Sequence, residues 1–120
     1  MIPLDLPDHS DKRSPIARLV GAYRWSMGSQ ASPMSPRLFA SELSLPLAGT
    51  KWAISPAQIR CWEKDFTIPH DDVLDGLTHY AEPDSWQWHF AQDIKAAKYP
   101  WRYAPSSEIG FRILERDKPL

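Results

Sequence analysis

The sequence predicts an all-α fold of five helices, followed by an extended C-terminal arm. Apolar residues recur at helical spacing in five segments of the chain. A serine followed by a proline, which suits a helix start, stands before the first and the third of these segments. Twelve prolines divide the chain, so the helices are expected to be short. A length of 120 residues fits one domain with a modest core.

The first two helices are expected after Ser14 and from Pro36. Ser14 can cap the first helix, and Pro15 fits its first turn. The buried stripe of this helix is expected to consist of Ile16, Leu19, Val20, Tyr23 and Met27. A loop over residues 28–35 precedes the second helix, whose apolar side consists of Leu38, Phe39 and Leu43, with Leu45 as a further candidate.

The third helix is expected over residues 55–63, and the rest of the chain is organised around it. The hydroxyl of Ser55 can accept a hydrogen bond from a free backbone N–H, and Pro56 occupies the first helical position. Ile59 and Trp62 lie three residues apart and share one apolar face. The helix therefore has one side to bury and one side to present.

The fourth and fifth helices follow Pro69 and Pro83. Asp71 and Asp72 stand at the start of the fourth helix, where their negative charge interacts favourably with the positive end of the helix dipole. Its apolar stripe consists of Val73, Leu74, Leu77, Tyr80 and Ala81. Asp84 or Ser85 can cap the fifth helix, whose apolar face consists of Trp86, Phe90, Ile94 and Ala97. A strand over residues 86–90, where aromatic residues also alternate, is the minor alternative.

The two ends of the chain are expected to be less regular. Residues 1–13 are polar and contain two prolines, which is typical of a flexible arm. Ile109, Phe111 and Ile113 alternate with other residues, which favours a strand or an extended arm. A lone strand is unstable, so this arm should pair with the N-terminal arm, with an inserted loop described below, or with a second copy of the protein.

Charge is segregated along the chain although the net charge is only −1. Residues 12–64 carry eight Lys and Arg against two acids, and residues 65–93 carry seven acids and no Lys or Arg. The basic part could face phosphates while the acidic part faces away. Alternatively the two parts attract each other and the remaining charges are solvated. The sequence leaves both interpretations open.

The pattern around the third helix resembles that of the Cro/repressor-like helix-turn-helix proteins, the XRE family. The residues that carry the resemblance are Ser55, Ile59, Trp62, Glu63 and Pro69. Upstream, residues 23–28 and 37–43 look like the end of the family's first helix and its second helix. The resemblance implies a flexible arm over 1–13, a helix-turn-helix domain over 14–98 and a C-terminal extension over 99–120.

One segment departs from the family pattern. Residues 44–54 stand where the family has a turn of about three or four residues, an insertion of roughly nine. This insertion contains Pro46 and Gly49 and could form a wing or an extended loop. Trp52 and Ile54 alternate, which allows a short extended piece, and the apolar content of the loop indicates that part of it packs.

The resemblance implies a sequence-specific transcriptional regulator that binds double-stranded DNA. The third helix would enter the major groove with its N-terminal residues near the bases. The candidate base contacts are Ala57, Gln58, Arg60 and Cys61, of which Gln58 and Arg60 have the better chemistry. The candidate phosphate contacts are Arg18, Arg37, Lys51 and Lys64. Arg24 is expected to form a structural ion pair with Glu63, and residues 99–114 to mediate a homodimer.

A second hypothesis treats the chain as a protein-interaction module on a degenerate helix-turn-helix scaffold. The loop over residues 44–54 and exposed tryptophans would then bind a protein partner, such as part of the transcription machinery. The weak hydrogen-bonding capacity of Ala57 and Cys61, the altered turn and the acidic part of the chain favour this hypothesis.

Enzyme chemistry finds little support in the sequence. His9, His70, His79 and His89 have no HExxH motif or paired cysteines around them, and no glycine-rich phosphate loop is present. Asp71, Asp72 and Asp75 suit a solvated helix end better than a metal site. We therefore expect no catalysis, metal or cofactor. The single cysteine, the lack of an apolar stretch of ~20 residues and the lack of a leader predict a cytoplasmic protein without membrane contact.

Overall fold

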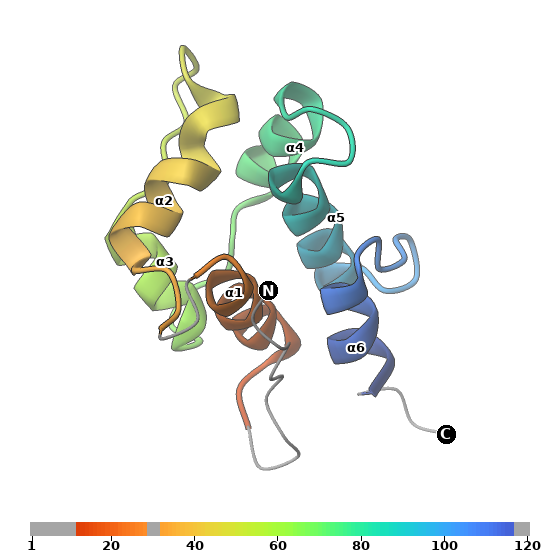
Figure 1. Ribbon diagram of the computed structural model, residues 1–120. Coiled ribbons are helices and arrows are strands. Elements are labelled where there is room, and N and C mark those ends of the chain that lie inside the picture. The colour runs from red at the N-terminus through yellow and green to blue at the C-terminus, as the bar shows by residue number, and fades with distance from the viewer. Residues whose placement is uncertain (1–11, 29–31, 117–120) are drawn as a thin grey trace.

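The computed structural model describes residues 12–28 and 32–116, and in these ranges it contains six α-helices, one 3-10 helix and no strands. The helices are α1 (Pro15–Ser26), α2 (Pro36–Ser44), η1 (Leu45–Leu47), α3 (Pro56–Glu63), α4 (Asp71–Tyr80), α5 (Trp86–Lys98) and α6 (Glu108–Arg116). The all-α class is therefore confirmed. Figure 1 shows α2 and α3 on one side of the molecule, α4, α5 and α6 on the other, and α1 between them.

Serine caps fix where four of the helices begin. The side chains of Ser14, Ser35, Ser55 and Ser85 each accept a hydrogen bond from a backbone N–H in the first turn of α1, α2, α3 and α5. A proline follows three of these caps, where its missing N–H leaves no hydrogen bond unmade. Local sequence therefore sets these boundaries, as predicted for α1, α3 and α5.

An aromatic cluster joins α1, α2 and α5 at the centre of the core. The ring of Phe90 packs edge-on against Tyr23 and Phe39, at centroid distances of 5.3 and 5.9 Å. Trp86 packs against Phe39 at 5.3 Å. Edge-to-face pairs of this kind add to the free energy of burial, by roughly 0.5–1.5 kcal/mol each. The cluster holds the α2–α3 side of the molecule to the α4–α6 side.

The C-terminal segment is a helix, so the prediction of an extended C-terminal arm was wrong. Ile109 and Ile113 are four residues apart as well as on alternate positions, and in α6 they lie on one helical face. Ile113 is buried in the same core as α1, whereas Phe111 is exposed. The minor alternative of a strand over residues 86–90 was also wrong, because Ser85 caps a regular helix there. The predicted N-terminal arm lies outside the described residues except for Lys12 and Arg13.

A buried carboxylate fixes α6 to α5 and α1. Asp93 on α5 accepts hydrogen bonds from the Tyr23 hydroxyl at 2.5 Å, from the Ser106 N–H at 2.7 Å and from the Ser107 hydroxyl. Ser107 in turn accepts a hydrogen bond from the Gly110 N–H in the first turn of α6. A Cβ at Gly110 would lie 2.2 Å from Asp93 Oδ1, so only glycine fits there. Burial, and then the nearby Asp93, raises the pKa of Tyr23 well above its ordinary value.

The inserted loop between α2 and α3 is closed at its base and packed against α4. The Ser44 hydroxyl donates to the carbonyl of Ile54 at 3.2 Å and accepts from its N–H at 3.1 Å. Leu47 and Ile54 are buried, and Trp52 stacks on His70 at a centroid distance of 6.2 Å. Part of the loop therefore packs, as expected. It begins with η1 and forms no strand, so the description as a wing does not apply.

Candidate nucleic-acid interface

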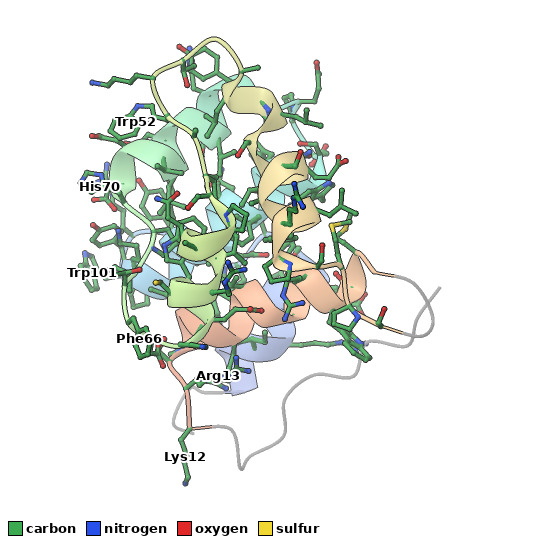
Figure 2. All side chains as sticks on the ribbon, turned by 90° about the vertical axis from the view of Figure 1, so that its left-hand side faces the viewer. Lys12, Arg13, Trp52, Phe66, His70 and Trp101 are labelled. Atoms are coloured by element: carbon green, nitrogen blue, oxygen red, sulfur yellow. The ribbon has the colours of Figure 1, made fainter. Side chains whose placement is uncertain are left out.

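Helix α3 is anchored by its apolar side and leaves its other side in solvent. Ile59 and Trp62 are buried among α1 and α2, while Ala57 and Arg60 are exposed and Cys61 is half-buried. Figure 2, in which the left-hand side of Figure 1 faces the viewer, looks onto the surface that α2 and α3 form. The exposed side of α3 is therefore part of this surface.

Gln58 has a structural role that the sequence reasoning missed. Its Oε1 accepts a hydrogen bond from the Ser55 N–H at 2.8 Å, and the Ser55 hydroxyl accepts one from the Gln58 N–H at 3.2 Å. These reciprocal bonds form a capping box, and the signal for it was a serine followed three residues later by glutamine. The amide oxygen needed for a bidentate contact with adenine is thus engaged in the free protein.

The ion pair that the resemblance implied joins α1 to the end of α3. Arg24 Nε donates to Glu63 Oε1 at 2.9 Å, and both side chains are largely buried. The ion pair is not bidentate, because Arg24 Nη1 donates to the carbonyl of Met34 at 2.8 Å and not to Glu63. Arg13 Nη1 donates to the backbone carbonyl of Glu63 at 3.2 Å. Arg24 therefore fixes both the C-terminal end of α3 and the chain before α2.

The four predicted phosphate-binding residues lie in different surroundings. Arg37 on α2 and Lys64 after α3 are exposed. Lys51 lies on the inserted loop, with its Nζ 5.1 Å from the centre of the Trp52 ring, and it lines a groove of about 510 Å³ with Asp72 and Asp75 of α4. Arg18 is half-buried on α1, where its Nε donates to the carbonyl of Arg13 at 3.1 Å. The structure thus brings Arg37 and Lys64 to the α2–α3 side and leaves Lys51 beside α4.

Two of the three acids of α4 are paired with lysines of α5 and not with α3. Asp71 accepts from Lys98 Nζ at 2.5 Å and from the Tyr99 hydroxyl at 2.6 Å. Asp75 lies 2.9 Å from Lys95 Nζ. By contrast Arg37, Arg60 and Lys64 have no carboxylate partner in the part of the chain that the structure describes. These three cations are therefore exposed to solvent, which both interpretations of the charge pattern allow.

Asp71 should make the stability of the fold depend on pH. The hydrogen bonds from Lys98, and then from Tyr99, lower the pKa of Asp71 below its ordinary value of 3.8. Its contribution should be complete above that value and should disappear as the pH falls through the lower folded-state pKa. Urea unfolding of the wild type and of Asp71→Asn should differ at pH 7 and converge in strong acid. The matched control Asp72→Asn, an exposed acid of the same turn, should show little difference at either pH, and a gap for Asp71→Asn that persists in strong acid would contradict the assignment.

Other site types find no support in the described residues. Among residues 12–28 and 32–116, no three His, Cys, Asp or Glu side chains are placed to hold a metal ion. No helix in these ranges combines the length and the apolar character needed to cross a bilayer. Comparison with protein-family models, with curated proteins and with solved structures found no match to this chain. A functional proposal for this chain therefore rests on its own geometry and charges.

Proposed function

We propose that this chain is a transcriptional regulator that binds double-stranded DNA sequence-specifically, through a repressor-like helix-turn-helix formed by α2 and α3. The observation that carries the proposal is the set of exposed cations Arg37, Arg60 and Lys64 on and beside these two helices, which have no carboxylate partner within residues 12–28 and 32–116. Exposed cations that are not engaged by a carboxylate are available to phosphates and base edges. The buried Ile59 and Trp62 support the proposal, because they fix α3 with Arg60 turned outward.

Arg60 is the principal base reader on this proposal. A guanidinium can donate two hydrogen bonds to one guanine, which is worth ~1–3 kcal/mol of discrimination. Ala57 would contact a thymine methyl group, and Cys61 would lie at the edge of the contact. Gln58 would contribute its free amide N–H groups while its oxygen holds the capping box. Arg37 and Lys64 would bind phosphates, with Arg18 and Lys51 as outlying members of the set.

The closed base of the inserted loop supports the proposal that α2 and α3 keep a helix-turn-helix arrangement in spite of the insertion. Because Ser44 bonds directly to Ile54, the chain leaves α2 and returns toward α3 at nearly the same point. Most of the inserted residues therefore project from the C-terminal end of α2, toward α4, and do not separate α2 from α3 (Figure 1). An insertion of this kind leaves the α2–α3 surface open to a DNA duplex.

Binding to random duplex DNA should weaken steeply as salt is added. Each phosphate contact contributes a slope of about −0.9 to log K against log salt concentration. The double variant Arg37→Gln, Lys64→Gln should reduce the slope by about 2 and weaken binding on all sequences alike. Fluorescence anisotropy of a labelled duplex measures both effects, with Arg112→Gln, which removes one cation on α6 and outside α2 and α3, as the control. Absence of binding at low salt would contradict the proposal.

One observation favours the alternative of a protein-interaction module. Trp101 is 80% exposed, which is unusual for so large an apolar side chain. Trp52, which the alternative also requires, is half-buried and stacked on His70, so the loop offers less free aromatic surface than expected. The same salt titration separates the two functions, because an interaction module requires no affinity for duplex DNA.

A further inference from the structure

A cavity lies between α4, the last turns of α5 and the turn that follows α5. Its volume is about 350 Å³, at the lower end of the roughly 300–1,000 Å³ that is usual for small-molecule sites. Acids of α4, a lysine of α5 and side chains of the turn line it: Asp71, Asp75, Lys95, Tyr99, Arg102 and Tyr103. None of these six residues belongs to α2 or α3 or to the residues proposed for DNA contact, so the cavity is a separate site.

Both acids of the cavity are already engaged by side chains of α5 and of the turn. Asp75 Oδ1 lies 2.9 Å from Lys95 Nζ. Asp71 accepts hydrogen bonds from Lys98 Nζ and from the Tyr99 hydroxyl. Because each carboxylate has a lysine of its own, a cationic ligand would have to displace a lysine before it could bind there. The two acids therefore do not make this cavity a cation site.

Arg102 gives the cavity an excess of positive charge. It is exposed, and it has no carboxylate partner in the part of the chain that the structure describes. Its guanidinium lies over the Tyr103 ring, 5.4 Å from the ring centre, and such stacking leaves the N–H groups at the guanidinium edge free for a planar acceptor. The charged groups in and beside the cavity are three cations and two acids, an excess of one positive charge: Lys95, Lys98 and Arg102 against Asp71 and Asp75.

Lys95 provides a second, nearly buried donor in the cavity. It is 8% exposed, which is rare for a lysine, and its Nζ lies 5.5 Å from the centre of the same Tyr103 ring. An ammonium has three N–H donors, and Asp75 is the one carboxylate that Lys95 contacts within residues 12–28 and 32–116. N–H donors of Lys95 and Arg102 are thus gathered around one aromatic ring, and both can donate to a further acceptor.

We propose that this cavity binds a small organic carboxylate with a planar apolar body. The carboxylate would accept two parallel N–H bonds from Arg102, with Lys95 as a further donor. The apolar body would lie against the rings of Tyr99 and Tyr103, whose centroids are 6.4 Å apart. One negative charge matches the excess of one positive charge, so a monoanion fits better than a dianion. Carboxylate binding here requires no contact with DNA, and it can be tested without DNA.

Calorimetric titration of the full chain with three probes that share a phenyl ring tests the class of ligand. Benzoate, a monoanion, should bind with a Kd of about 1 mM or tighter. Phenyl phosphate, a dianion at pH 8, should bind more weakly than benzoate, because its second charge meets the two acids of the cavity. Benzylamine, a cation, should not bind. Absence of benzoate binding, tighter binding of phenyl phosphate, or binding of benzylamine would overturn the proposal.

Two variants of the cavity should change benzoate binding in opposite directions. Arg102→Gln removes the principal donor and should raise the Kd at least about tenfold. Asp75→Asn removes a negative charge and releases N–H donors of Lys95, so it should lower the Kd by about threefold or more. The control Arg60→Gln removes an exposed arginine of α3 that also has no carboxylate partner in the described residues, and it should bind benzoate like the wild type. Far-UV circular dichroism checks that every variant is folded.

Amide chemical shifts then show where benzoate binds. In a ¹H–¹⁵N correlation spectrum of the full chain, the shifts that change on titration should be concentrated in residues 71–75 and 95–103. Changes centred on α3, or a loss of affinity in Arg60→Gln equal to that in Arg102→Gln, would show that benzoate binds to any exposed cation. Either result, or weaker binding by Asp75→Asn, would overturn the proposal, and none of these measurements depends on whether the chain binds DNA.

Discussion

Replacement of Arg60 by alanine should weaken binding to the specific DNA site by roughly 5- to 150-fold, which corresponds to about 1–3 kcal/mol. The guanidinium is exposed on α3 and has no partner in the described residues, so its loss removes base contacts and leaves the fold intact. The site is first obtained by selection from genomic fragments. Anisotropy titrations of that site and of random duplex then measure the change in specificity.

Two controls make the Arg60 result specific. Lys64→Gln should weaken binding to the selected site and to random duplex by the same factor, because a phosphate contact carries no sequence information. Arg112→Ala removes a cation on α6, where Arg112 lies within reach of Glu108, and it should leave DNA binding unchanged. Unchanged affinity of Arg60→Ala for the selected site would remove Arg60 from the proposed base readers.

Replacement of Asp93 by alanine should lower the free energy of unfolding by about 3–5 kcal/mol and the Tm by more than about 10 °C. The carboxylate is fully buried and accepts from Tyr23, from the Ser106 N–H and from Ser107. Alanine would remove the acceptor of all three donors, of which the Tyr23 hydroxyl keeps the Ser107 oxygen at 2.9 Å as a second partner. Each buried or partly buried donor left without an acceptor costs about 1–3 kcal/mol. Thermal and urea unfolding, followed by circular dichroism, measure the loss.

The amide variant separates hydrogen bonding from charge at this position. In Asp93→Asn, the amide oxygen can face the Ser106 N–H while the amide nitrogen donates to the hydroxyls of Tyr23 and Ser107, both of which can accept. Asp93→Asn should therefore keep most of the stability that Asp93→Ala loses. The control Glu82→Ala, an exposed acid, should change stability by less than about 0.5 kcal/mol. Equal losses for Asn and Ala would show that the charge, and not the hydrogen bonds, holds α6.

The first five helices could be predicted because their signals are local. Serine caps, prolines at the first helical position and apolar residues at helical spacing act within one or two turns. The buried side of α3 followed in the same way from Ile59 and Trp62. For the candidate interface, the sequence predicted that Arg37, Arg60 and Lys64 take part. It could not show whether a carboxylate distant along the chain pairs with them.

What the sequence alone determined about this protein is its all-α class, the starts of most helices and the outward side of α3. The tertiary structure decided the state of residues 108–116, the closure of the inserted loop and the pairing of the acids. The physical reason is that each of these depends on groups that are distant along the chain. Asp93 accepts hydrogen bonds that fix the start of a helix for a pattern that also fits a strand, and Ser44 hydrogen-bonds to Ile54 across the loop. Lys95 and Lys98 engage Asp75 and Asp71 of α4, so these carboxylates do not pair with α3.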